Sequence, residues 1–172
     1  TNNNFFGSGA GSQSATGDSN NFFGRQAGYW NTTGSCNNFL GRFAGRYNTT
    51  GCNNNFLGFE GGYCNTTGCY NNFFGRCAGF ANTTGSYNNF FGVNAGRYNT
   101  TGSFNNFFGC CAGFCVTTAQ HNNFFGYRTA ANTAATAARA PRGFGGPVGS
   151  STAELRPWCQ ASIVLVRRQQ CH

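Results

Sequence analysis

Charge is scarce in this chain. Charged side chains make up 8% of its 172 residues, against about 25% in a typical globular domain. Only Asp18, Glu60 and Glu154 are acidic. Calcium-binding solenoid repeats need acidic ligands at regular intervals, and acid–base catalysis needs a positioned carboxylate or histidine. The shortage excludes a calcium-binding repeat, and we expect no enzymatic activity.

Metal-ligand spacings and long apolar runs are missing as well. No C-x2-C pair occurs, and the only histidines are His121 and His172, so we expect no metal site and no cofactor. The longest apolar stretch, residues 161–166, is broken by a serine. It falls far short of the roughly 18 residues that cross a bilayer, so we expect no membrane span.

The positive charge comes entirely from arginine. The net charge is +8, with six arginines in the first 136 residues and five in the remainder. Such a balance fits an anionic partner, such as a surface polysaccharide, or simply the solubility of an otherwise neutral fibre. We favour solubility and do not expect a nucleic-acid partner.

Glycine, phenylalanine and cysteine are abundant instead, with 27, 20 and 10 copies. An aromatic content of 17% argues against a disordered coil, because disordered chains are poor in aromatic residues. Ten cysteines suit an oxidising, extracellular setting, although a free thiol also packs as a small apolar side chain.

An unbroken period of 17 residues organises most of the chain. The block N-N-F-(F/L)-G occurs eight times between Asn3 and Asn122 without an insertion or a deletion. Numbered from its first asparagine, the repeat reads N-N-F-F-G-x-x-A-G-x-x-N-T-T-G-x-x. A constant period is required where each residue stacks on its equivalent in the next repeat. The sequence therefore predicts an all-β solenoid of seven to eight coils over residues 1–136.

Helical repeats are excluded by the length of the period. Two packed helices need roughly 30 residues or more, and each glycine of the repeat disfavours a helix by about 1 kcal/mol. We expect short strands at the phenylalanine block and in the alanine–glycine region, turns at N-T-T-G and at the glycine junctions, and coils stacked about 4.8 Å apart.

Positions 3 and 4 carry two consecutive large apolar residues. Adjacent residues of a strand face opposite sides, and position 4 shares its parity with the alanine at position 8. We therefore expect position 4 to fill the core and position 3 to form an outward aromatic stripe that marks an interface. The alternative is that a bend at the following glycine places both rings inside. The predicted stacking ladder at position 3 consists of Phe5, Phe22, Phe39, Phe56, Phe73, Phe90, Phe107 and Phe124.

Asparagine supplies two further features. The two asparagines before each phenylalanine can form hydrogen-bonded ladders along the stack. The N-T-T-G block matches the N-glycosylation sequon, which would place glycans in a row on one edge, but its turn chemistry alone also explains it. The candidate glycosylation sites are Asn31, Asn48, Asn65, Asn82 and Asn99.

Two cysteine pairs are candidate disulfides. Cys52 and Cys69 occupy the same position in adjacent coils, and a Cα separation of about 4.8 Å is within disulfide range. Cys64 and Cys77 would meet if their columns are close. In the tail, Cys159 and Cys171 are available to bridge to the repeat or to another chain.

The stretch Asn82 to Gly96 reads NTTGSYNNFFGVNAG. It resembles the 17-residue repeats of the type NTTGSNNTFIGYQAG, found in bacterial and phage surface proteins, adhesins and tail-fibre-like chains. The resemblance covers about residues 1–133 and implies a β-solenoid in a fibrous surface protein, without catalytic residues. This chain departs from that type in having asparagine for threonine, a second phenylalanine for an aliphatic residue, and many cysteines.

Residues 137–172 lack the repeat, and we expect them to form a C-terminal cap or an inter-subunit connector. No cap precedes the first repeat, which favours head-to-tail stacking of protomers into an open filament. The sequence thus predicts a structural subunit of a self-assembling extracellular fibre, with the chain itself as its main partner. The alternatives are an adhesin stalk, or a solenoid whose Asn31 and Thr33 columns bind ice or a polysaccharide.

Overall fold

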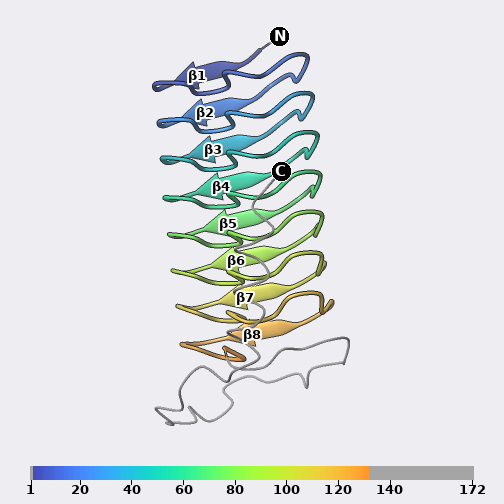
Figure 1. Cartoon of the computed structure of the whole chain (residues 1–172). Helices are drawn as coiled ribbons and strands as arrows, with labels where there is room; N and C mark the ends of the chain where they lie inside the picture. Colours follow the sequence, from blue (N-terminus) through green and yellow to red (C-terminus); the bar gives the residue numbers. More distant parts are fainter. Residues whose placement is uncertain (1, 132–172) are drawn as a thin grey trace.

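The computed structural model describes residues 2–131, which form one parallel β-solenoid (Figure 1). Each coil contributes one three-residue strand to a single eight-stranded parallel sheet in the order β1 to β8, and the described residues contain no helix. The strands are β1 (Asn4–Phe6), β2 (Asn21–Phe23), β3 (Asn38–Leu40), β4 (Asn55–Leu57), β5 (Asn72–Phe74), β6 (Asn89–Phe91), β7 (Asn106–Phe108) and β8 (Asn123–Phe125). The predicted all-β solenoid is confirmed; the predicted cap or connector at 137–172 lies outside the described residues.

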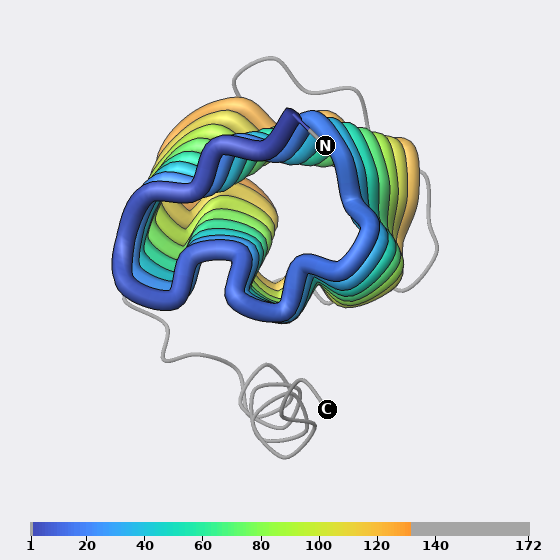
Figure 2. Tube along the Cα trace, turned by 90° about the horizontal axis from the view of Figure 1, so that it is seen from above, coloured from blue at the N-terminus to red at the C-terminus, as the bar shows by residue number. Residues whose placement is uncertain are grey.

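Every strand pairs with the next without a shift in register. Phe5 pairs with Phe22 at one end of the sheet and Phe107 with Phe124 at the other. Seen along the stack, the coils nearly superimpose, with a small progressive rotation (Figure 2). The unbroken period causes this, because one inserted residue would displace every later column by one place.

The strand expected in the alanine–glycine region is wrong, because this region forms a turn in every described coil. Residues with positive φ close each coil there and before the next strand. Positions 7 and 17 adopt the left-handed conformation in nearly every copy, as Gln26 (φ 55°) and Cys36 (φ 58°) show in the second coil. Position 9 needs glycine for a second reason, because a Cβ on Gly28 would lie 2.6 Å from Cδ2 of Phe22. The tight turns therefore depend on two non-glycine residues per coil in a conformation that L residues seldom adopt.

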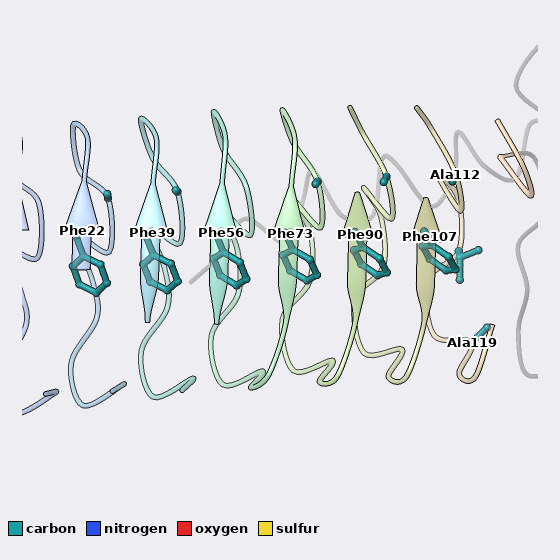
Figure 3. Close-up of a cluster of buried hydrophobic side chains, with 13 residues drawn as sticks. Phe22, Phe39, Phe56, Phe73, Phe90, Phe107, Ala112 and Ala119 are labelled. Carbon is teal, nitrogen blue, oxygen red and sulfur yellow. The ribbon is translucent and has the colours of Figure 1, made fainter. Parts of the chain in front are cut away.

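A column of phenylalanine rings and a column of alanines form the apolar core (Figure 3). The position-3 rings from Phe22 to Phe107 are fully buried. Along the whole ladder, consecutive rings stack nearly parallel with centroids 4.7–5.0 Å apart. Each stacked pair adds about 0.5–1.5 kcal/mol beyond the burial of its area. The coils are thus held together by identical contacts at every step.

The predicted orientation of positions 3 and 4 is wrong. Position 3 points inward, and position 4 points outward, with Phe23 43% and Leu40 39% exposed. The alternative with both rings inside is wrong for the same reason. The parity argument assumed an extended backbone between positions 4 and 8. Glycine at position 5 (φ 136° at Gly24) and the left-handed residue at position 7 interrupt the alternation, so alanine at position 8 shares the interior with position 3.

Asparagine ladders fill the rest of the interior. Asn37, at position 1, donates from Nδ2 to the carbonyl oxygen of Gly51 across its own coil (2.8 Å) and accepts the backbone N–H of Asn54 from the next coil (3.0 Å). Asn48, at position 12, donates to Gly51 O (2.9 Å) and to Oδ1 of Asn31 (2.7 Å). These amides are buried but hydrogen-bonded, so their burial costs little.

Candidate functional site

The outer face of the sheet carries a continuous apolar column, here called the Phe/Leu stripe. It consists of the position-4 side chains Phe6, Phe23, Leu40, Leu57, Phe74, Phe91, Phe108 and Phe125, which are all partly or largely exposed. Toward the C-terminal end of the sheet, consecutive rings stack at centroid distances of 4.7 Å (Phe74–Phe91), 4.8 Å (Phe91–Phe108) and 5.2 Å (Phe108–Phe125). The stripe is therefore apolar along the height of the described solenoid, and its rings stack in order from Phe74 to Phe125.

An uncharged amide ladder lies beside the stripe. Position 2 is asparagine in every coil and also faces outward, because it alternates with the buried position 3. Asn21 Nδ2 donates to Asn38 Oδ1 at 2.8 Å, and Asn89 repeats the contact with Asn106 at 2.8 Å. No charged side chain occurs in either column. These two columns therefore carry no charge that would repel another apolar surface.

A second exposed aromatic column occupies position 17, at a corner of the coil. Tyr70, Tyr87, Phe104 and His121 stack in sequence with centroids 4.9–5.0 Å apart and planes within 7°. The ring faces cover one another, so mainly the edges reach solvent. A sugar ring that binds to an aromatic side chain needs an open face, which this column does not offer.

A cation–π cluster is built around Arg46. Its guanidinium carbon lies 5.2 Å from the ring centre of Phe43 and 5.3 Å from that of Tyr47, and its Nη1 donates to the hydroxyl of Tyr63 (3.3 Å). Burial raises the pKa of Tyr63, with the neighbouring Tyr47 acting in the same direction. The guanidinium also lies 5.9 Å from the ring centre of Tyr29 in the preceding coil and 6.0 Å from that of Tyr63 in the next coil, so the cluster stabilises the stack.

The predicted glycosylation sites lie inside the solenoid. Asn31, Asn48, Asn65, Asn82 and Asn99 are 0% exposed. Asn65 shows the typical contacts: its Nδ2 donates to Gly68 O (2.9 Å) and Asn48 Oδ1 (2.7 Å). A sugar on this nitrogen would remove one of these bonds and would have to pass through the wall of the coil. The predicted row of glycans is incompatible with this packing. In the structure the two threonines of N-T-T-G form a bend that the asparagine side chain spans.

The asparagine and threonine columns that were predicted to bind a ligand together lie on opposite sides of the backbone. The Asn31 column lies inside, while the Thr33 column is exposed. Thr32, between them, donates from Oγ1 to the carbonyl oxygen of Thr49 (3.0 Å). Only one of the two expected columns can therefore contact a ligand.

The predicted disulfides Cys52–Cys69 and Cys64–Cys77 are not formed, because Cys52, Cys69 and Cys77 are free thiols. Cys69 Sγ accepts the backbone N–H of Cys52 (3.1 Å), as the Ser86 hydroxyl accepts that of Cys69 (3.0 Å). Equivalent side chains in an in-register parallel stack point the same way, so their Cβ atoms do not converge to the roughly 3.8 Å that a disulfide requires.

Cys77 is buried at position 7. Its thiol donates to Glu60 Oε2 in the preceding coil at 3.6 Å. Burial raises the pKa of the Cys77 thiol, while the charge of Arg97 acts in the opposite direction. This thiol therefore keeps its proton at neutral pH, and its burial limits access from solvent.

Residues 2–131 contain no place where three histidine, cysteine, aspartate or glutamate side chains converge on a common point. In the same range no helix has the length and apolar character of a membrane span. Comparison with known protein families, characterised proteins and solved structures finds no match to this chain. The geometry of the solenoid and its surface columns is therefore the basis for a functional proposal.

Sequence reasoning assigned the outward stripe to the wrong column, although the sequence contains the signal. Position 3 is phenylalanine in all eight copies, whereas position 4 accepts Leu40 and Leu57. A fully enclosed site tolerates less change of shape than an exposed one. Invariance would thus have marked position 3 as the interior column.

Proposed function

We propose that this chain is a structural subunit of an extracellular fibre, in which the Phe/Leu stripe packs against the same stripe of a second copy. The observation that carries the proposal is the stripe itself, which runs uninterrupted over all eight coils with exposed aromatic rings at both ends. Contiguous exposed apolar surface of this kind is typical of protein–protein interfaces. A second copy fits because it offers a matching uncharged, ladder-like surface.

Growth along the axis uses contacts that the solenoid already repeats. The amide ladder at position 2 has the same 2.8 Å bond at Asn21–Asn38 and at Asn106–Asn123. Each coil thus offers another the same amide donor and acceptor at position 2 and the same phenylalanine ring at position 3. Protomers that stack head-to-tail through these contacts form an open filament. The resemblance to repeats of bacterial and phage surface fibres supports the extracellular location.

An adhesin stalk is the alternative that keeps the same architecture. A stalk is a rigid rod that holds a binding domain away from a surface. It needs the stacked rings and amide ladders that join its coils, but no contact between the Phe/Leu stripes of two copies. Arg25, Arg42 and Arg76 are exposed at position 6, and they support contact of such a stalk with an anionic surface polysaccharide. Ice or polysaccharide binding through asparagine and threonine columns is not favoured, since the asparagine column is internal.

The test compares substitutions in two exposed aromatic columns. In the stripe, the double variant Phe74→Thr/Phe91→Thr removes two stacked rings while keeping residues that suit a strand. We expect lateral association to weaken about tenfold or more, because truncating interface aromatics typically costs more than 1 kcal/mol. Sedimentation velocity and electron microscopy of the full chain measure this.

The matched control is Tyr70→Ser/Tyr87→Ser at position 17, where Ser19 already occurs in the first coil. This variant removes an equal number of exposed stacked rings and should associate as the unmodified chain does. Circular dichroism checks that both variants keep the fold. Discrete single rods of the unmodified chain at high concentration would contradict the fibre proposal. Equal association of both double variants would contradict the role of the stripe.

A further inference from the structure

Positions 6 and 7 bring adjacent side chains together on one side of the backbone. Adjacent residues of an extended chain point apart, but position 7 has a left-handed backbone, with φ 59° at Cys111. Two other coils show the resulting contact. Arg42 lies 4.6 Å from the ring centre of Phe43, and Arg128 lies 5.9 Å from that of Tyr127. The repeat therefore builds a pair of touching neighbours at this corner.

The seventh coil places two thiols in this arrangement. The sulfurs of Cys110 and Cys111 are 3.5 Å apart, and both cysteines are free and half-buried. Hydrogen bonds from Cys111 N to Val93 O (2.8 Å) and from Arg128 N to Cys110 O (2.8 Å) fix the backbone between neighbouring coils. Among residues 2–131, this is the only coil with cysteine at both positions.

We propose that Cys110 and Cys111 form a bidentate dithiol site for a thiophilic metal or metalloid centre of the trivalent arsenic type. Thiolate ligands select such soft centres. Two sulfurs about 2.3 Å from a pyramidal trivalent centre, with a bond angle of about 90–100°, lie about 3.3–3.5 Å apart, which agrees with the observed separation. Within residues 2–131 no third metal-binding side chain converges on this pair, so these residues alone supply two of the four ligands that a closed structural zinc site needs.

The reaction with a trivalent arsenical needs no oxidant or reductant. With phenylarsine oxide, two As–S bonds form, the arsenic–oxygen bond breaks, and both thiol protons leave with the oxygen as water. Arsenic stays trivalent throughout. Burial raises the pKa of the Cys111 thiol, and the neighbouring Cys110 adds to this effect. The Cys111 thiol thus keeps its proton at neutral pH, and this proton is one of the two that leave with the oxygen.

The experiment uses the full chain and phenylarsine oxide, with intact-mass measurement after a challenge by excess 2-mercaptoethanol. A chelating pair resists this monothiol and releases arsenic only to a competing dithiol. The site variants are Cys111→Asn and Cys110→Val, which place at each position the residue that Asn94 and Val93 supply in the preceding coil. The control is Cys69→Ser, because Ser86 occupies the same position in the next coil.

We expect the unmodified chain and Cys69→Ser to keep one monothiol-resistant arsenical that each site variant lacks, a loss of at least tenfold in occupancy. Retention of that arsenical in Cys111→Asn, or its loss in Cys69→Ser, overturns the proposal. So does an unmodified chain that binds none. The outcome is independent of fibre formation, which is measured separately.

Discussion

The phenylalanine at position 3 and the glycine at position 9 pack directly against each other. Each buried phenylalanine ring occupies the space that a side chain at the glycine six residues later would need, as Phe22 does at Gly28. The fourth coil departs from the repeat beside this pair, because position 8 is Gly61 instead of alanine. Gly61 has no positive φ, so its backbone conformation does not require glycine. The core there lacks the methyl group that an alanine would supply.

Gly61→Ala should stabilise the solenoid. A Cβ there would meet its nearest neighbour, Gly58 O, at 3.7 Å, which is an ordinary contact. The substitution should add about 0.4–1 kcal/mol to the free energy of unfolding, because it reduces the entropy of the unfolded chain. Urea unfolding measures it.

Gly62→Ala is the matched control one residue further on. Its φ is 57°, and a Cβ would lie 2.5 Å from Cδ2 of Phe56. This variant should lose more than about 1 kcal/mol. A destabilised Gly61→Ala, or an unaffected Gly62→Ala, would show that the ring and glycine columns do not pack as described.

Whether the side chains of a column point inward or outward was harder to predict than which residues form the column. The composition of each column could be read directly from the repeat. The direction of each column depends on backbone dihedrals at variable positions, such as Gln26 and Cys36, which are not glycine and carry no sequence signal for a positive φ. The contact between Cys110 and Cys111 was missed for the same reason.

The N-T-T-G turn is the element in which two columns are most closely coupled. Asparagine at position 12 donates to the carbonyl oxygen of glycine at position 15, as Asn99 does to Gly102 (3.0 Å). In the seventh coil both residues change, to Val116 and Ala119. The asparagine ladder therefore stops at Asn99, whose Oδ1 is buried without a hydrogen-bond donor.

Val116→Asn alone should be destabilising, and Ala119→Gly should rescue it. A Cβ at position 15 lies against the asparagine ladder, for example 2.8 Å from Nδ2 of Asn65 when built on Gly51. With both changes, residue 116 can donate to Asn99 Oδ1 and satisfy the buried acceptor. A favourable coupling of about 1–3 kcal/mol is expected.

A double-mutant cycle on urea unfolding gives the coupling between Val116→Asn and Ala119→Gly. Additive effects of the two substitutions would contradict the coupled turn. The sequence predicted the turn itself. It did not distinguish a buried hydrogen-bonded asparagine from a glycosylated one, because the same four residues satisfy both requirements.

At the scale of the whole solenoid over residues 2–131, the interfaces between coils repeat the same columns, apart from the departures at Gly61, Val116 and Ala119. Stability in such an array is approximately a sum over coils and their nearest-neighbour contacts. The fold was predictable from the sequence because the period alone dictates the stack. The disulfide prediction was wrong, because it used only the spacing between Cα atoms. It did not consider that the side chains of Cys52 and Cys69 point in the same direction.

Removal of one complete coil should preserve the fold. Deleting residues 71–87 joins Tyr70 to Asn88 and keeps every later column in place. The variant should keep the β circular dichroism and a cooperative thermal transition, with a modest loss of stability. Deleting residues 71–86 instead shifts all later columns by one place and should abolish the cooperative transition. Similar melting of the two deletion variants would contradict in-register stacking.

The two side-chain amide ladders run in opposite directions along the axis. At position 2 the donor belongs to the earlier coil, as in Asn21 to Asn38, whereas at position 12 it belongs to the later coil, as in Asn48 to Asn31. Each ladder adds up aligned amide dipoles, but their opposed polarity cancels much of the sum. Lengthening the rod therefore adds little net dipole moment from these two columns of side chains.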